Sequence, residues 1–259
     1  ALAALPSNDE RLAQAIRGRN VVLGISAETQ PDPRFPEPPR APPIVVSGDV
    51  AAGLANFPGH IRSLDVIDAA AARRGSMNSG PADQLVRQVP LLVQAQGRIV
   101  PSLAVESLRV ALDAGMRVAT AGGGLLSIRF DTVDTAAQSD GTTWVRFGRH
   151  EEDRFVPAWA VMEGRADALG HLRDKVVLVG VNGLGVLDHK TTPLGEFVPG
   201  VEVHAQVIEN LYNGARLTRP DIAPRLEAAA LLALGFLLIA YVPRLSALQG
   251  INVVLGMVV

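Results

Sequence analysis

The chain has 259 residues, a formal net charge of −2 and no cysteine. The near-neutral charge argues against a nucleic-acid partner, because such binding needs Lys and Arg to neutralise phosphates. The lack of cysteine excludes disulfides, thiolate metal sites and thiol nucleophiles. An apolar content of 48% lies at the upper edge for a soluble protein, and the apolar residues concentrate near the C-terminus. The length allows one large domain or two small ones.

The first elements alternate between helix and strand. Ser7 and Glu10 have the spacing of a capping box, which predicts a short helix closed at Gly18. Val21–Ile25 is apolar and rich in β-branched residues, as expected of a buried strand. Pro31–Pro43 holds seven prolines and is expected to form a surface loop, because proline joins neither a ladder nor a helix interior. A polyproline ligand for a partner is the alternative for this segment.

The middle of the chain continues this alternation. Ile44–Val46 is a predicted strand, and Leu64–Ala71 has helical spacing. Leu85–Gln94 alternates imperfectly around a proline, which indicates an edge strand or a bent strand. Ser102–Leu112 is a predicted helix, and Gly115 stands where a left-handed C-terminal cap is expected.

Three further strands and a helix complete the predicted domain. Leu126–Phe130 and Trp144–Phe147 are expected to pair with each other around a polar tract. Phe155–Met162 is predicted to be helical, and Lys175–Gly180 has the strongest strand pattern of the chain. Strands that alternate with helices predict an α/β fold with a mixed sheet flanked by helices.

The Gly-rich loop Gly180–Thr192 follows the strongest predicted strand. Ligands of open α/β sheets bind beyond the carboxyl ends of strands, where loop amides and helix N-termini converge. Asn182, Asp188, Thr191 and Thr192 are therefore candidate ligand-binding residues for a small molecule or a protein ligand. The alternative is a packed structural loop in which the aspartate and the threonines cap backbone groups.

A helix over Val201–Asn213 comes next, and its two faces differ in polarity. The apolar spacing predicts a buried face made of His204, Val207, Ile208 and Leu211. The opposite, exposed face is predicted to carry Glu202, Gln206, Glu209 and Asn213. His204 is interpreted as a structural histidine bonded to a neighbouring loop, or as a group that responds to pH or ligand. We include it among the candidate ligand-binding residues.

Motifs for catalysis and cofactor binding are incomplete. Gly180–Gly185 resembles a phosphate loop but lacks the Lys and Ser/Thr that follow, and Gly183–Asp188 lacks the third glycine of the dinucleotide fingerprint. Gly24–Glu28 lacks the final glycine of a nucleophile elbow. The five histidines show no metal-binding spacing, although Asp188, His189 and His204 could meet in space. We expect no catalytic residue, no cofactor and no metal.

The C-terminal part is apolar and predicts membrane insertion. Leu226–Val242 is uncharged after Glu227, and its helical length of ~25 Å is near the low end of membrane spans. A buried core helix is the alternative. Leu245–Val259 begins a second apolar run after Pro243-Arg244, which predicts a transmembrane helical hairpin. The expected domains are thus residues 1–222 and residues 223–259, with the lipid bilayer as a partner of the second.

The order of several short motifs between Asp9 and Pro220 resembles the CHASE2 domain. The pieces are, in chain order, Asp9–Ile16, Leu85–Leu92, Pro101–Leu108, Leu172–Gly180, Gly183–Asp188, Thr192-Pro193, Pro199–Gly214 and Leu217–Pro220. The resemblance implies an extracytoplasmic sensory module of a bacterial membrane-bound receptor. Such a module is followed by about three membrane helices and by a cytoplasmic adenylate or guanylate cyclase, histidine kinase or Ser/Thr kinase.

The resemblance also sets expectations for the whole protein. The first membrane helix, the opening strand, the third C-terminal helix and the effector of the family lie outside the sequence, so the chain is expected to be a fragment. It implies a multi-pass inner-membrane protein with a periplasmic sensory domain, and it leaves homodimerisation open. It supplies no binding residues. A membrane-anchored periplasmic enzyme or a transport-associated subunit is the alternative, which the incomplete catalytic motifs disfavour.

Overall fold

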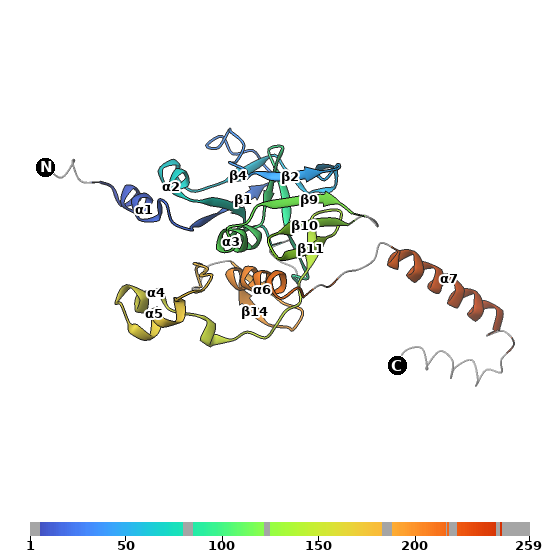
Figure 1. The fold of residues 1–259 in the computed structure, drawn as a ribbon. Coiled ribbons are helices and arrows are strands. Elements are labelled where there is room, and N and C mark those ends of the chain that lie inside the picture. The colour runs from blue at the N-terminus through green and yellow to red at the C-terminus, as the bar shows by residue number, and fades with distance from the viewer. Residues whose placement is uncertain are drawn as a thin grey trace. The chain divides into compact units, whose positions relative to one another are not determined.

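The computed structural model describes residues 6–79, 85–121, 125–182, 188–215, 217, 222–241 and 244. The chain divides into two compact units, Ala1–Thr218 and Arg219–Val259. The first unit contains all the strands and the helices α1 to α6, and the second contains helix α7 (Figure 1).

The first unit alternates short strands with short helices. Its helices are α1 (Asn8–Ile16), α2 (Asp65–Ala70), α3 (Leu103–Ala111), α4 (Ala158–Met162), α5 (Ala166–Leu172) and α6 (Gly200–Tyr212). Its first strands are β1 (Val22–Glu28), β2 (Ile44–Ser47), β3 (Asn56–Phe57), β4 (Gly59–Ile61), β5 (Arg73–Ser76), β6 (Gln88–Pro90) and β7 (Leu92–Ala95). The remaining strands are β8 (Arg98–Pro101), β9 (Met116–Thr120), β10 (Leu126–Phe130), β11 (Val133–Ala137), β12 (Thr142–Trp144), β13 (His189–Thr191) and β14 (Phe197–Pro199).

The strands form several small mixed sheets. Strand β1 lies between antiparallel β4 and parallel β5. A second sheet has the order β11-β10-β9-β2, in which only the β2–β9 pair is parallel. Strands β3, β7 and β8 form a third sheet, and β6–β12 and β13–β14 are separate pairs. The predicted α/β class is therefore confirmed, with its strands divided among several sheets.

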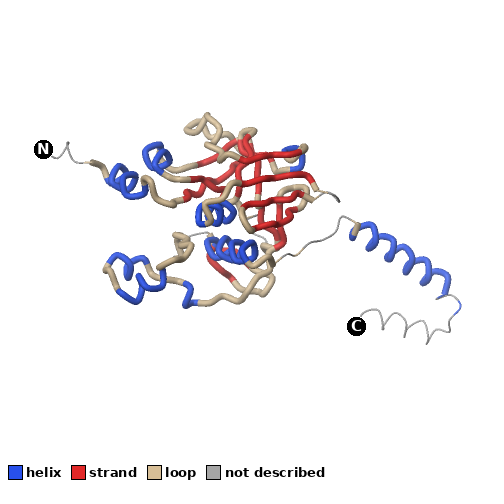
Figure 2. Tube along the Cα trace, viewed as in Figure 1, coloured by secondary structure: helices blue, strands red, loops and turns tan. Residues whose placement is uncertain are grey.

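Helix α3 packs between the strands and helix α6. Figure 2 shows most of the strands gathered on one side of the first unit, and Figure 1 shows α3 and then α6 beneath them, with β14 beside α6. The approach of α3 to β5 depends on Gly75, because a Cβ there would lie 2.6 Å from the Leu103 Cα. Ser102 begins α3 by accepting a hydrogen bond from the Val105 amide at 3.3 Å. The main core includes Leu91, Leu92, Val105, Met116, Ile128, Phe130, Val203 and Val207.

The predicted N-terminal elements are confirmed. Ser7 caps α1 through the Glu10 amide at 3.2 Å, and the Glu10 carboxylate accepts a bond from the Ser7 amide at 2.7 Å. Gly18 follows the helix at a φ of +69°, a conformation that glycine adopts without strain. Strand β1 extends to Glu28, three residues beyond the predicted end, and residues 31–43 form no helix or strand.

The predicted pairing of Leu126–Phe130 with Trp144–Phe147 is wrong. Strand β10 pairs instead with β11, and Phe130 lies opposite Val133. The two-residue turn between them places Asp131 at a φ of +48°, which matches the twist of a tight hairpin. Trp144 belongs to β12, which pairs with β6. The polar tract thus contains a strand that its composition concealed.

The C-terminal cap predicted for helix α3 is also displaced. Asp113, with a φ of +47°, takes the left-handed position after α3, whereas Gly115 has no positive φ. Aspartate tolerates this region better than most residues, because its short side chain bonds locally.

Lys175–Gly180, predicted as the strongest strand, forms no strand in the structure. Within the described residues, Lys175–Asn182 makes no backbone hydrogen bond, and Val179 is 95% exposed. Leu178 alone packs against the core. A β-branched pattern fits a sheet surface only where a neighbouring strand supplies the ladder, and no described strand runs beside this segment.

The second unit contains α7 (Ala223–Tyr241), and the predicted apolar helix is confirmed. It has 19 residues, and an 18-residue window within it has a mean hydropathy of 1.7. A helix of this length extends ~28 Å, close to the thickness of a hydrocarbon core. The second predicted run, residues 245–259, lies outside the described residues. The structure therefore provides one candidate span and does not show a hairpin.

Candidate functional site

The first turn of α6 is the centre of the candidate site. Strand β14 delivers the chain to Gly200, whose amide donates a hydrogen bond of 2.8 Å to the Asp188 carbonyl. The Asp188 carboxylate packs against the same glycine, since a Cβ there would lie 2.4 Å from Oδ1. A carboxylate at a helix N-terminus is stabilised by the positive end of the helix dipole. Gly200 therefore makes room for the acidic group at this position.

His204 lies one turn further along α6 and is 5% exposed. Its Nε2 lies 3.2 Å from the Met77 carbonyl, so Nε2 carries the donated proton. Burial lowers the pKa of His204, and Lys190 lowers it further, while the Met77 carbonyl and Asp188 act in the opposite direction. The ring is therefore neutral at pH 7, and its buried Nδ1 has no hydrogen-bond partner among the described residues.

Met77 connects His204 to the carboxyl ends of the parallel strands β1 and β5. The next residue, Asn78, bonds through its side chain to both the amide and the carbonyl of Ala27, each at 2.9 Å. Ser76 donates to the Asn78 Oδ1 at 2.6 Å. The carboxyl edge of a parallel pair is where ligands bind in open α/β sheets. The structure thus brings His204 to such an edge. The edge is formed by β1 and β5, and not by the strand predicted at Lys175–Gly180.

The sequence did not predict β5, which creates this edge. Its residues, Arg73–Ser76, are polar, and strand patterns are recognised by apolar alternation. Arg74 is nevertheless only 8% exposed, because its guanidinium pairs with the Asp68 carboxylate at 3.1 Å. The ion pair allows a charged residue to occupy a buried strand position.

The threonines of the predicted loop have different positions. Thr191 is exposed in β13, and its carbonyl accepts a bond from the Val86 amide at 2.9 Å. Thr192 is fully buried, and its Oγ1 is without a partner among the described residues. Its backbone amide and carbonyl close a turn with Glu196 and Gly195, each at 2.9 Å. Both threonines therefore contribute backbone bonds to a packed loop.

Of the five candidate residues, Asp188 and His204 both lie at the start of α6, close enough for the Asp188 charge to raise the pKa of His204 against the effect of burial. Thr191 is the last residue of β13 and follows Lys190, which also acts on the His204 ring, and Thr192 comes directly after the strand. Asn182 is exposed, and the described interactions place it in contact with none of the other four. Residues 183–187, which held the incomplete phosphate and dinucleotide motifs, lie outside the described part of the chain.

The face of α6 predicted to be exposed is partly buried, which corrects the sequence interpretation. Glu202 is 6% and Gln206 is 4% exposed, and each bonds to the segment Arg146–His150. Glu202 accepts the His150 Nδ1 at 2.7 Å, and Gln206 accepts the Gly148 amide at 2.8 Å. Asn210, four residues on, donates to the Arg146 carbonyl at 3.1 Å. These three polar residues are spaced four apart and so form a polar stripe along the helix. That spacing could have indicated that another segment is hydrogen-bonded to this face.

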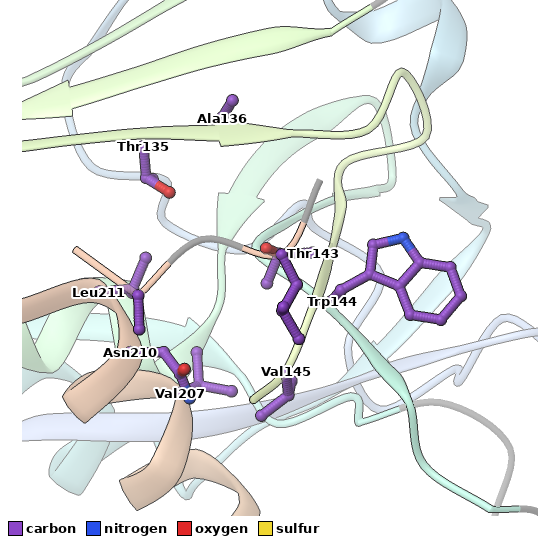
Figure 3. A pocket seen from close by; sticks show the side chains of 10 residues that line it. Thr135, Ala136, Thr143, Trp144, Val145, Val207, Asn210 and Leu211 are labelled. Carbon is purple, nitrogen blue, oxygen red and sulfur yellow. The ribbon is translucent and has the colours of Figure 1, made fainter. Parts of the chain in front are cut away.

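A small void near the C-terminal half of α6 is too small for a ligand. Figure 3 shows Val207, Asn210 and Leu211 on the helix, opposite Thr135 on β11 and Val145 after β12. The void encloses about 10 Å³, which corresponds to about one water molecule.

Within the described ranges, no group of three His, Asp or Glu side chains has a geometry that could hold a metal ion. His189, one of the alternative ligands, stacks on the Phe197 ring with the centroids 4.8 Å apart.

These features define a folded α/β domain followed in sequence by an apolar helix of membrane-spanning length. The chain belongs to the CHASE2 domain family, whose family model matches residues 2–242. CHASE2 domains are extracytoplasmic sensory domains of membrane signalling receptors. The expected resemblance is thereby confirmed. No curated protein and no solved structure matches the sequence.

Proposed function

We propose that this chain is the sensory input of a receptor that passes a signal to a cytoplasmic cyclase or kinase. The main support is the order of its elements. Helix α6, whose N-terminus packs against Asp188 and whose buried face carries His204, ends at Tyr212, and α7 begins at Ala223. Only residues 213–222 separate the two helices in the sequence.

The proposed stimulus is a small molecule or a protein ligand that binds beside Asp188, Thr191, Thr192 and His204, with Asn182 as a further candidate. Coupling requires this ligand to bind two states of the domain with different affinities. A shift of α6 along its polar stripe would distinguish the states, and the short connection would transmit the shift to α7.

The proposed location is the inner membrane, with the sensory domain in the periplasm. The family supports an extracytoplasmic domain, and α7 supports membrane attachment. A multi-pass arrangement and a homodimer of sensory domains are parts of the same proposal. The second apolar run, residues 245–259, supports the additional span by its composition.

A double perturbation in the complete receptor tests the proposal without knowledge of the stimulus. We expect Asp188→Ala and His204→Ala to change basal effector output at least about fivefold, the lower range of allosteric coupling. The exposed His171→Ala is the control. Inserting three or four Gly/Ser residues between Thr218 and Pro224 should make the output of wild type and His204→Ala the same.

The same insertion between Glu37 and Pro38, in the proline-rich loop, should leave the difference intact. If the linker insertion also preserves the difference between wild type and His204→Ala, direct mechanical coupling is wrong. Dimerisation of the sensory domains would then be the mechanism to test.

A further inference from the structure

A second hollow lies far along the strands from the His204 site, at their amino ends. It is a shallow hollow, open to solvent, with a volume of about 400 Å³, which is of the size of small-molecule pockets, ~300–1,000 Å³. Strands β2 and β5 begin at this hollow, and the turn from α3 to β9 closes it. We call it the β2–α3 hollow. Its lining is Pro43, Ile44, Val45, Arg73, Arg109, Asp113, Ala114, Gly115 and Met116.

Arg109 forms a fixed wall of this hollow. It is 2% exposed, and its Nη1 donates to the Glu106 carboxylate at 2.5 Å. Its Nε and Nη2 both donate to the Ala114 carbonyl, at 3.4 and 3.3 Å. Burial raises the pKa of Glu106, and Arg109 opposes that change. This pair fixes the turn after α3, and its charge is already balanced.

Arg73 and Asp113 add one charge each to this hollow. Glu106 is attracted by both Arg109 and Arg73, so one carboxylate faces two guanidinium groups and one positive charge is in excess. Neither side chain makes a hydrogen bond or an ion pair with any described residue. Arg73 is half-buried at the start of β5, and Asp113 is exposed at the end of α3. The left-handed backbone of Asp113, at a φ of +47°, holds it directly after the helix. Both Arg73 and Asp113 thus line the same hollow, and neither is held in a hydrogen bond or ion pair with a described residue.

The two positions favour ligand groups of opposite charge, a cation beside Asp113 and an anion beside Arg73. The C-terminus of α3 has the negative end of a helix dipole, which adds to the attraction of Asp113 for a cation. Arg73 presents a planar fork of donors that matches a carboxylate. The remaining lining is mainly apolar, from Pro43, Ile44 and Met116 among others.

We propose that the β2–α3 hollow binds a zwitterionic amino acid with an apolar side chain. The ligand carboxylate would bind Arg73, its ammonium group would bind Asp113, and its side chain would contact the apolar wall. That this ligand acts as a stimulus rests on the sensory function proposed above, whereas its binding does not.

Calorimetry on the full chain in lipid nanodiscs tests the binding. The probes are L-alanine, L-valine, L-leucine and L-methionine, with two analogues of leucine. One analogue, 4-methylpentanoate, lacks the ammonium group, and the other, 3-methylbutylamine, lacks the carboxylate. We expect saturable binding of at least one amino acid, and binding about tenfold or more weaker for both analogues, because each loses a charged hydrogen-bonding group.

Two variants and two matched controls locate the ligand. Arg73→Gln and Asp113→Asn should each weaken binding about tenfold or more. Arg117→Gln removes an exposed arginine of β9, and Asp131→Asn changes an exposed aspartate with the same backbone conformation, at a φ of +48°. Both controls should leave the affinity unchanged, and the thermal melting of all four variants should match wild type.

Three results would overturn the inference. These are no binding of any of the four amino acids up to about 10 mM, equal binding of 4-methylpentanoate, or affinity unchanged in both pocket variants. Receptor output separates the two proposals. If a bound amino acid leaves output unchanged, its role as stimulus fails. If binding is absent but His204→Ala still changes output through the linker, only this inference fails.

Discussion

His60 is a fully buried titratable residue of the first unit. It is 0% exposed, and among the described residues its ring nitrogens lack a hydrogen bond of regular geometry, although the Gln96 side chain lies near the ring. The Phe35 ring, from the proline-rich loop, lies 5.8 Å from it. Burial and the nearby Arg62 lower the pKa of His60, while Gln96, Asp68 and Asp32 act in the opposite direction. The neutral ring is thus the form that the folded protein accepts.

The buried His60 makes stability dependent on pH. Because its pKa is lower when folded, the unfolded chain binds the proton first as the pH falls below about 6.5. We expect the free energy of unfolding to be highest above pH 7 and to fall by up to about 1.4 kcal/mol per pH unit below that. Chemical denaturation of wild type and His60→Phe between pH 8 and about 5 measures this. The variant should show the weaker dependence.

The exposed His171→Phe is the control for this experiment, and its pH dependence should match wild type. Part of the dependence should survive in His60→Phe, because burial also lowers the pKa of His204. Identical pH profiles for wild type and His60→Phe would contradict the prediction.

Gly75 permits the close contact between β5 and α3. Gly75→Ala would place a Cβ within 3.0 Å of three backbone atoms of Ser102 and Leu103, which side-chain motion cannot relieve. We expect a loss of about 1–3 kcal/mol in the free energy of unfolding. Gly170→Ala, in α5 with no atom near its Cβ, should be neutral or stabilising. A Gly75→Ala protein as stable as wild type would show that the contact is looser.

Helix α6 is the element that connects most parts of the candidate site. Its apolar face joins the core through Val203 and Val207, and its polar stripe binds the segment Arg146–His150. The backbone of that segment is held by side chains of the helix and, at the His150 amide, by the Glu196 carboxylate at 2.9 Å. Movement of α6 along its axis would therefore break bonds on one face while apolar contacts slide on the other.

Gln206 provides a test of this polar stripe. Gln206→Ala removes the side-chain acceptor of the Gly148 amide, and we expect a loss of about 0.5–1.5 kcal/mol in the free energy of unfolding, the net contribution of a typical hydrogen bond. Hydrogen–deuterium exchange at Gly148 should accelerate more than the global loss explains. Glu209→Ala, which removes an exposed pair with Arg154, should cost less than about 1 kcal/mol. Unchanged protection at Gly148 would rule out the proposed role of Gln206.

An element was predictable from the sequence when the contacts that fix it are local in the chain, and not when they join distant residues. Helix α1 was predictable from its capping box and α6 from its apolar period, because both signals are local in the sequence. Strand β5 was not predictable, because a polar strand is buried only when Arg74 pairs with Asp68 and when β1 lies beside it, and the apolar pattern of the sequence shows neither contact. Lys175–Gly180 failed for the converse reason, since a strong local pattern does not supply a neighbouring strand.

The candidate site was predictable only in part for the same reason. The sequence indicated His204 on a buried face and Asp188 near the start of its helix. The contact of His204 with Met77 joins residues 127 positions apart, and no local pattern encodes it. The burial of Glu202 likewise depends on His150, on a distant segment.

For the whole molecule, membrane topology is the property to test. We expect the turn at Pro243-Arg244 to face the cytoplasm and the proline-rich loop to face the periplasm. Because the chain has no cysteine, single cysteines can report each side without background. Arg244→Cys should resist a membrane-impermeant thiol reagent in intact cells, and Pro38→Cys, at an exposed site, should react. The reverse pattern would contradict the topology.

The segment Lys175–Asn182, which makes no backbone hydrogen bond with any described residue, has a practical consequence for work with the purified protein. Its amide and carbonyl groups, next to exposed valines, offer a template on which chains can stack into intermolecular β-structure. We expect concentrated samples to scatter more light with storage time, and Val179→Lys to slow that growth, because a lysine on an open strand edge opposes stacking. The variant would lengthen shelf life without touching either proposed ligand site.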